Sequence, residues 1–186
     1  MRFALSAVAL LWACSASAAT PSPHWTVDNA KSRLSFSVQW SGEAFTAAFK
    51  RWKADIQFDP ADLAHARASV SIDLTSETSD FPDNDEGLKG TQGFETSKFP
   101  SARFEATHFV HGSGNNYTAD GTLTLHGMTK HVTLPFTLAI NGKTAHMTGR
   151  TILMRPDFGL AGGEFSGDTP IAHAVTVNID LTATRP

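Results

Sequence analysis

The chain has 186 residues, of which 41% are hydrophobic and 18% are charged, and its formal net charge is −3. These values are typical of a single soluble globular domain. Because the sequence contains no basic stripe, we expect neither nucleic acid nor an anionic membrane surface as a partner.

Residues 1–19 have the features of a secretory signal peptide. Arg2 is followed by an uncharged run from Phe3 to Ala13, and small residues occupy 16–19. Cleavage near Ala18 or Ala19 would leave a mature domain of 20–186. Its formal charge would be 14 minus 18, or −4, because Arg2 is removed. We therefore expect an exported protein of the periplasm.

Cys14 is the only cysteine of the chain. Cleavage after it would leave a mature protein without intramolecular disulfides, so that burial alone would stabilise the fold. The alternative is a lipoprotein in which Cys14 is lipidated and becomes the new N-terminus. Trp12 fits that alternative poorly, because small residues usually precede a lipidated cysteine.

Apolar and polar residues alternate along most of the mature chain, which predicts antiparallel strands. The first three are expected over 34–40, 45–58 and 68–74. In the second, the apolar parity switches at Lys50-Arg51, and one inserted residue would explain such a switch, so we expect a β-bulge there.

The remaining five strands complete a set of eight. The fourth is expected over 102–110, the fifth and sixth form a hairpin within 117–140, and the last two lie over 144–154 and 175–181. Pro135 cannot donate a backbone hydrogen bond, so we expect a bend or a locally unpaired position there. No helical periodicity longer than a turn or two appears. The chain is therefore predicted to be all-β.

Eight antiparallel strands with mostly short connections can close an up-and-down barrel. Since successive strands alternate in direction, connections 41–44, 75–101, 126–129 and 156–172 must share one rim. Long loops are uncommon unless they have a function. We therefore expect the mouth of the barrel at the rim that carries the two long loops, 75–101 and 156–172.

The aromatic composition suits an apolar interior. Of the 13 phenylalanines one, Phe3, lies in the signal peptide, and the chain has a single tyrosine, so few buried aromatics carry a hydroxyl. A filled core and a hollow barrel would both show this composition. Small residues at inward positions favour the hollow form: Ala47, Ala54, Ala68, Ala106, Ala119 and Gly121.

Catalytic and metal sites find no support in the sequence. His108 and His111 would lie on opposite faces of a strand, and His126, His131 and His173 are interpreted as polar rim residues. No acid, base and nucleophile share a recognisable spacing. We therefore predict no catalytic residue, no metal and no required cofactor.

Several segments together resemble one known family. They are Ser32-Arg33-Leu34-Ser35-Phe36, Phe49-Lys50-Arg51-Trp52, Lys98-Phe99-Pro100-Ser101-Ala102-Arg103-Phe104, Asp120-Gly121-Thr122-Leu123-Thr124-Leu125-His126-Gly127 and Arg155-Pro156-Asp157-Phe158-Gly159. Over about 25–185 the chain is similar to the YceI-like family of exported polyisoprenoid-binding proteins. The resemblance implies a lipocalin-like barrel that holds one long amphiphile, such as a polyprenyl chain or an isoprenoid quinone.

The resemblance also implies a partner and a head group. Some relatives are fused or adjacent to membrane b-type cytochromes, which makes such a cytochrome a candidate partner. Where relatives often carry an Arg-Asp pair, this chain has Asn84-Asp85, and Gly93 and His131 also depart from the family pattern. These departures favour a less charged head group than a diphosphate.

The sequence thus predicts a periplasmic carrier that shields an isoprenoid tail inside the barrel. The expected lining residues are Phe36, Val38, Trp40, Phe49, Trp52, Phe104, Leu123, Leu125, Phe136 and Phe158. The expected head-group residues at the rim are Lys130, His131 and Arg155. One alternative is a filled β-barrel that binds another protein through loop 75–101, and another is an enzyme that acts on a lipid. The oligomeric state is left open.

Overall fold

The computed structural model describes residues 22–79 and 81–186, so the predicted signal peptide and Cys14 lie outside the described residues. Eleven strands form one antiparallel sheet, and α1 spans Pro82–Lys89. The strands are β1 His24–Val27, β2 Arg33–Trp40, β3 Glu43–Phe49, β4 Trp52–Gln57, β5 Arg67–Asp73, β6 Glu77–Ser79, β7 Ser101–His111, β8 Asn116–Leu125, β9 Met128–Asn141, β10 Thr144–Met154 and β11 Ile171–Thr184. The 3-10 helices are η1 Asn29–Lys31, η2 Leu63–His65, η3 Leu74–Ser76, η4 Arg155–Phe158 and η5 Gly163–Phe165. In the described part of the chain, helices long and apolar enough to cross a membrane are absent.

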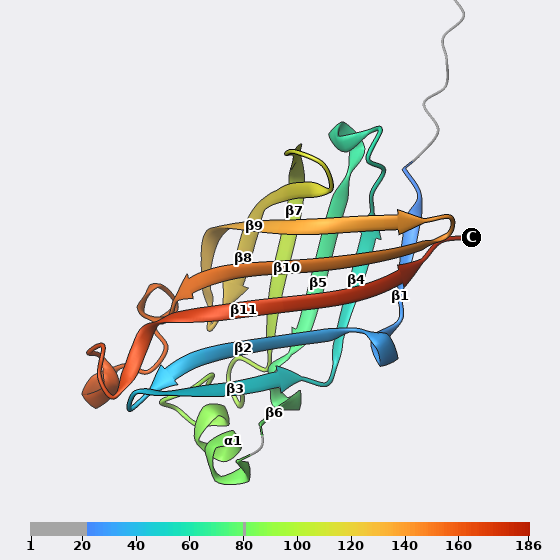
Figure 1. The fold of residues 1–186 in the computed structure, drawn as a ribbon. Coiled ribbons are helices and arrows are strands. Elements are labelled where there is room, and N and C mark those ends of the chain that lie inside the picture. Colours follow the sequence, from blue (N-terminus) through green and yellow to red (C-terminus); the bar gives the residue numbers. More distant parts are fainter. Residues whose placement is uncertain (1–21, 80) are drawn as a thin grey trace, which may run out of the picture.

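The sheet closes on itself at β11. This strand pairs with β10 along its length, and its last residues also pair with β1, through Thr26 with Thr184 and Val27 with Ala183. The closed ring is β1-β4-β5-β7-β8-β9-β10-β11, and β2, β3 and β6 extend the sheet from β11 (Figure 1). The predicted eight-stranded antiparallel barrel is confirmed, but its strands differ from the expected set. β1, which was not predicted, belongs to the ring, whereas β2 and β3 lie outside it.

The second predicted strand is divided into β3 and β4. The division lies at Lys50 and Arg51, where the apolar parity switches. The Lys50 N–H donates to the carbonyl of Ser76 (3.1 Å), and the Arg51 N–H donates to its hydroxyl (2.9 Å). Because η3 supplies these acceptors, the chain leaves the ladder for two residues instead of forming a bulge within one strand.

Pro135 lies where β9 leaves β10. The β9–β10 ladder runs from the Asn141–Thr144 pair to the Phe136–Gly149 pair and stops there, whereas on its other edge Pro135 stays in register with Thr118 of β8. The missing N–H therefore falls on an edge without a strand partner. This agrees with the expected locally unpaired position.

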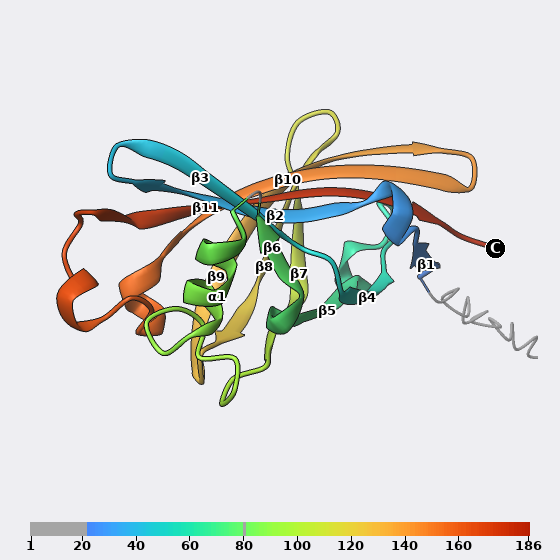
Figure 2. The same cartoon turned by 90° about the horizontal axis from the view of Figure 1, so that it is seen from below.

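The predicted loop 75–101 is more ordered than its sequence suggests. It contains the end of η3, the short strand β6 and the two-turn helix α1, which lies against β6 (Figure 2). Pro82 occupies the first turn of α1, where a missing N–H does no harm. The helix is too short, and its residues too polar, to show a helical period in the sequence.

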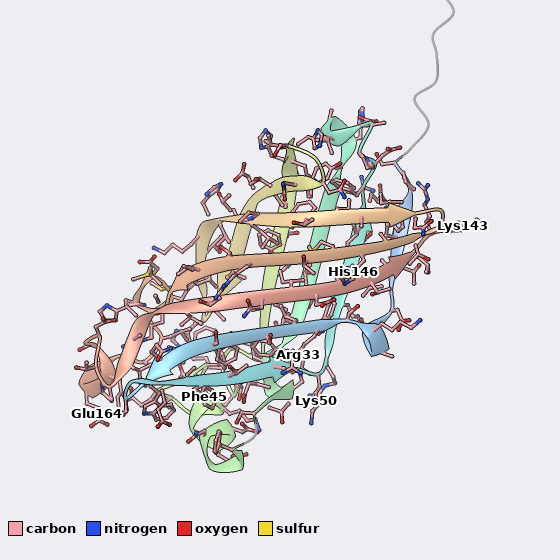
Figure 3. All side chains as sticks on the ribbon, in the orientation of Figure 1. Arg33, Phe45, Lys50, Lys143, His146 and Glu164 are labelled. Atoms are coloured by element: carbon pink, nitrogen blue, oxygen red, sulfur yellow. The ribbon has the colours of Figure 1, made fainter. Side chains whose placement is uncertain are left out.

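The connections expected at one rim do meet there. The Ser41 N–H donates to the Pro170 carbonyl (2.7 Å), and the Ala161 N–H donates to the Gln92 carbonyl (3.1 Å). Figure 3 shows Glu164 of η5 at this end and Lys143, of the β9–β10 turn, at the other. The two long connections therefore contact each other across the rim where the sequence analysis expected a mouth.

Arg155 organises the connection between β10 and β11. It is 4% exposed, and the five N–H groups of its guanidinium lie within hydrogen-bonding distance of six backbone carbonyls, so that at least one N–H is shared between two acceptors. The acceptors are Leu160, Ala161, Phe165, Gly167, Ile171 and Ala172, at 2.5–3.2 Å. One planar cation thus satisfies carbonyl groups over most of the loop, which a neutral side chain cannot do.

We expect Arg155→Lys to lower the free energy of unfolding by about 2–4 kcal/mol, since a lysine supplies three donors from one nitrogen and leaves buried carbonyls unpaired. Urea unfolding followed by tryptophan fluorescence measures the change. Arg150→Lys, at an exposed position of β10, is the matched control and should change stability by less than about 0.5 kcal/mol. Equal effects of the two substitutions would show that the carbonyl contacts contribute nothing.

Candidate functional site

An apolar cavity of about 470 Å³ occupies the barrel. It extends from Trp25, Ala145 and Ala183 at one end to Leu88 and Phe165 at the rim of the long connections. This volume is in the range of small-molecule binding sites. The interior is therefore hollow, which the filled-barrel alternative does not allow.

All ten residues predicted to line the interior lie on the wall of this cavity. They are Phe36, Val38, Trp40, Phe49, Trp52, Phe104, Leu123, Leu125, Phe136 and Phe158. Strand alternation places them there, because inward positions recur every second residue on each strand. Their contact with a ligand stays a prediction.

The small inward residues do not all leave free volume. Ala68 and Ala119 line the cavity, but Ala106 is 1% exposed within the core and Gly121 lies against the backbone of β7. A Cβ on Gly121 would collide with the Glu105 carbonyl, next to the irregular register at Ala106 and His108. Glycine at this position therefore permits close contact between two strands rather than space for a ligand.

Aromatic side chains pack beside the cavity at the rim end. Phe94, from the segment after α1, lies 5.9 Å from the rings of both Phe36 and Phe49, measured between centroids. Trp40 and Phe45 form a further edge-on pair at 6.0 Å. Such edge-on and tilted pairs hold the segment after α1 against the β2–β3 wall.

Few polar side chains reach the cavity. Those that line it are Asn84, Gln92, Thr151 and Arg155. The Thr151 hydroxyl donates to the Thr133 carbonyl (2.9 Å), and Arg155 is occupied by the six carbonyls described above. Asn84, within α1, and Gln92, in the segment after it, are the two residues with neutral amides among those that line the cavity.

The three predicted head-group residues do not form a charged rim site. Lys130 and His131 are exposed on β9 and neither lines the cavity. His131 pairs in the ladder with Thr122 and belongs to the outward-facing set of β9, close to Asp120. Arg155 lines the cavity, but its guanidinium already binds backbone. The sequence does not reveal these bonds, because the carbonyls that Arg155 binds follow it in a connection without periodicity.

His126 joins three parts of the rim. Its Nδ1 lies 3.1 Å from the Phe158 carbonyl, its Nε2 lies 3.4 Å from a carboxylate oxygen of Glu95, and its ring packs edge-on against Phe99. This histidine therefore has a structural role. Over residues 22–79 and 81–186, groups of three or more His, Cys, Asp or Glu side chains placed to hold a metal are absent.

Several cavity residues were missed by the sequence analysis. They come from the two long connections and comprise Asn84, Leu88, Gln92, Leu160 and Phe165. No alternation marks these positions, because they do not lie on strands. The sequence indicated these residues only through the length of the two loops, because long loops in a compact domain usually have a function.

Comparison with known proteins places this barrel in a family. The model of the YceI-like domain matches residues 25–183. A UPF0312 protein of Vibrio cholerae serotype O1 is 26% identical over 128 residues, which are 67% of this chain and 68% of that protein. A UPF0312 protein of Photorhabdus laumondii is 30% identical over 93 residues, 50% of this chain and 48% of that protein.

Solved structures show the same fold. Burkholderia cenocepacia BcnA superposes with a TM-score of 0.82 at 31% identity, covering 85% of this chain and 99% of BcnA. A polyisoprenoid-binding domain from Saccharophagus degradans, implicated in plant cell wall breakdown, has a TM-score of 0.69 at 17% identity, with 88% and 99% covered. From the family match over most of its length, the chain belongs to the YceI-like domain family.

Proposed function

We propose that this protein is a periplasmic carrier that holds the tail of one isoprenoid lipid in its barrel. The observation that carries the proposal is the apolar cavity of about 470 Å³, whose wall is built by inward side chains of every strand of the closed ring. The resemblance in fold to a polyisoprenoid-binding domain supports this ligand class. Burial of a tail contributes roughly 0.8 kcal/mol per methylene, so tail length should dominate the affinity.

The head group is proposed to be uncharged, as in an isoprenoid quinone. Asn84 and Gln92 bring neutral amides to the rim end of the cavity. Among the described residues, Arg155 is the one cationic side chain on the wall, and it is already bonded to backbone carbonyls. A diphosphate would need unpaired cations in that place. A quinone carbonyl needs only a neutral donor, which an amide provides.

Export to the periplasm and exchange of the quinone with a membrane b-type cytochrome complete the proposal. The features of residues 1–19 support export, and the resemblance to relatives associated with such cytochromes supports the partner. The protein is proposed to bind its ligand without converting it. No catalytic residue and no cofactor other than this ligand enter the proposal.

Organic extraction of the purified protein followed by mass spectrometry tests the ligand. An isoprenoid released unchanged, close to one per chain, is expected. An enzyme would instead release a converted product. A preparation that yields no lipid, and takes up no added ubiquinone, would overturn the carrier.

Leu123→Arg should abolish lipid retention, because an unpaired guanidinium in an apolar cavity is strongly unfavourable. Leu123 is 8% exposed and lines the cavity, and Lys130 is its exposed ladder partner on β9. Lys130→Ala is therefore the control and should weaken retention only slightly. Equal losses in the two variants would contradict binding dominated by the tail.

Ala68→Phe tests occupancy of the cavity without adding a charge. Ala68 lines the cavity on β5, and Ser71 is an exposed residue of the same strand. A phenyl group at 68 fills volume that the tail would need, so retained lipid should fall at least about tenfold. Ser71→Phe should leave it unchanged. The lipid content of both proteins, measured after extraction, decides the outcome.

A further inference from the structure

The barrel wall is incomplete beside β6. Pairing between β5 and β7 ends at Asp73 with Ser101, and the Leu74 N–H then donates to the Pro100 carbonyl (2.9 Å). Beyond that point β6 pairs with β3, and among the described residues no strand covers its other edge. Residues of α1 and of the segment after it line the cavity on this side. Figure 2 shows α1 next to β6.

Among the described residues, few hydrogen bonds join α1 and the segment after it to the rest of the barrel. Asp85 accepts hydrogen bonds from the N–H (2.9 Å) and the hydroxyl (2.6 Å) of Ser79, and the Gln92 carbonyl accepts one from Ala161. The helix has eight residues and contains Gly87, so its intrinsic stability is low. Short elements of this kind open at a fraction of the free energy of global unfolding.

Glu77 is a buried acid beneath this helix. Its side chain is 3% exposed, and it pairs in the ladder with Phe49, which lines the cavity. Neither carboxylate oxygen has a hydrogen-bond partner among the described residues. An ionised carboxylate without a partner is costly in such a site, whereas a neutral carboxyl is tolerated.

Among the described side chains, the charged groups that act on Glu77 come from α1. Burial, and then the charge of Asp85, raise the pKa of Glu77 to about 7, while Lys89 acts in the opposite direction. Lys89 also lies 3.5 Å from Glu86 of the same helix. From β3 the ladder partner is Phe49, which does not titrate. The group therefore changes its charge near neutral pH.

We propose that α1 is a lid over a lateral passage into the cavity and that Glu77 is its latch. The lid lies on the barrel while the Glu77 carboxyl is neutral, and it lifts when that carboxyl loses its proton and draws in water. The passage serves the ligand of the proposed function, on which this part rests. The latch itself is a property of the fold and needs no ligand.

The direction of the pH dependence follows from linkage. When α1 lifts, Glu77 is hydrated and its pKa falls from about 7 toward the ordinary value of 4.5. The open form thus holds fewer protons, so the fraction open rises with pH between about 4.5 and about 7, by at most tenfold per pH unit, and then levels off. Acid conditions keep the lid closed, and mildly alkaline conditions favour release.

Hydrogen exchange of the full chain without lipid tests the latch. The reporters are the amides of Gly90 and Phe94, which donate to Glu86 and Leu88. Comparing wild type with Glu77→Gln at the same pH cancels the intrinsic pH dependence of exchange. We expect the two proteins to differ only a few-fold at pH 5 and at least about tenfold at pH 8, with wild type faster. A ratio that is the same at both pH values would overturn the latch.

Glu86→Gln is the matched control for charge on the same helix, because the Glu86 side chain is 83% exposed. It should keep the pH dependence of the wild type. Gly87→Ala tests the lid independently of titration: a Cβ there meets no atom within 4 Å, so alanine should stabilise α1 and slow exchange about threefold. Faster exchange in Gly87→Ala would contradict a helical lid.

Release of a two-isoprene ubiquinone analogue to lipid vesicles tests the passage. The release rate of the wild type should rise at least about tenfold from pH 5 to pH 8, and that of Glu77→Gln should not. Release without pH dependence, in a protein whose α1 exchange does depend on pH, would overturn the passage. If no analogue binds at any pH, the proposed function fails, while the exchange measurement still decides the latch.

Discussion

Closure of the sheet between β1 and β11 is the constraint on which the rest of the structure depends. Once the last residues of β11 pair with β1, every strand of the ring has two neighbours and all inward side chains face one another. The alternation of apolar and polar residues along the strands is then sufficient to make the interior apolar. Because eight strands enclose a narrow cylinder, large inward residues on the wall leave a channel where alanines such as Ala68 and Ala119 face it.

Polar groups are consequently restricted to the ends and the outside of the barrel. Arg155 is an example. This buried cation lies on the cavity wall, but its guanidinium is bonded to backbone carbonyls of the connection that follows it. Asn84 of α1 and Gln92 after it bring neutral amides to the cavity wall. An uncharged head group at that end, with the tail along the barrel, is the arrangement that the proposed function requires.

Glu77 departs from the pattern, and it does so where the wall is incomplete. Most inward positions carry apolar or small residues, but β6 places a carboxyl that has no hydrogen-bond partner among the described residues next to the eight-residue helix α1. Proteins tend to break local rules at functional positions. In the proposed latch, the placement of this acid under a helix that also lines the cavity makes access to the interior depend on pH.

The sequence by itself determined most of the strands, though not β1 and β6, together with the shared rim of the long connections and the ten wall residues, because a period of two assigns every strand residue to a face. Tertiary structure decided the rest. The short helix α1, the carbonyls bound by Arg155 and the burial of Glu77 all arise from contacts between connections or across the barrel, which no local period records. Lys130 and His131 do not line the cavity, and the sequence did not show this, because position along a strand gives the face of a side chain but not where the cavity ends. Their contact with a head group stays a prediction.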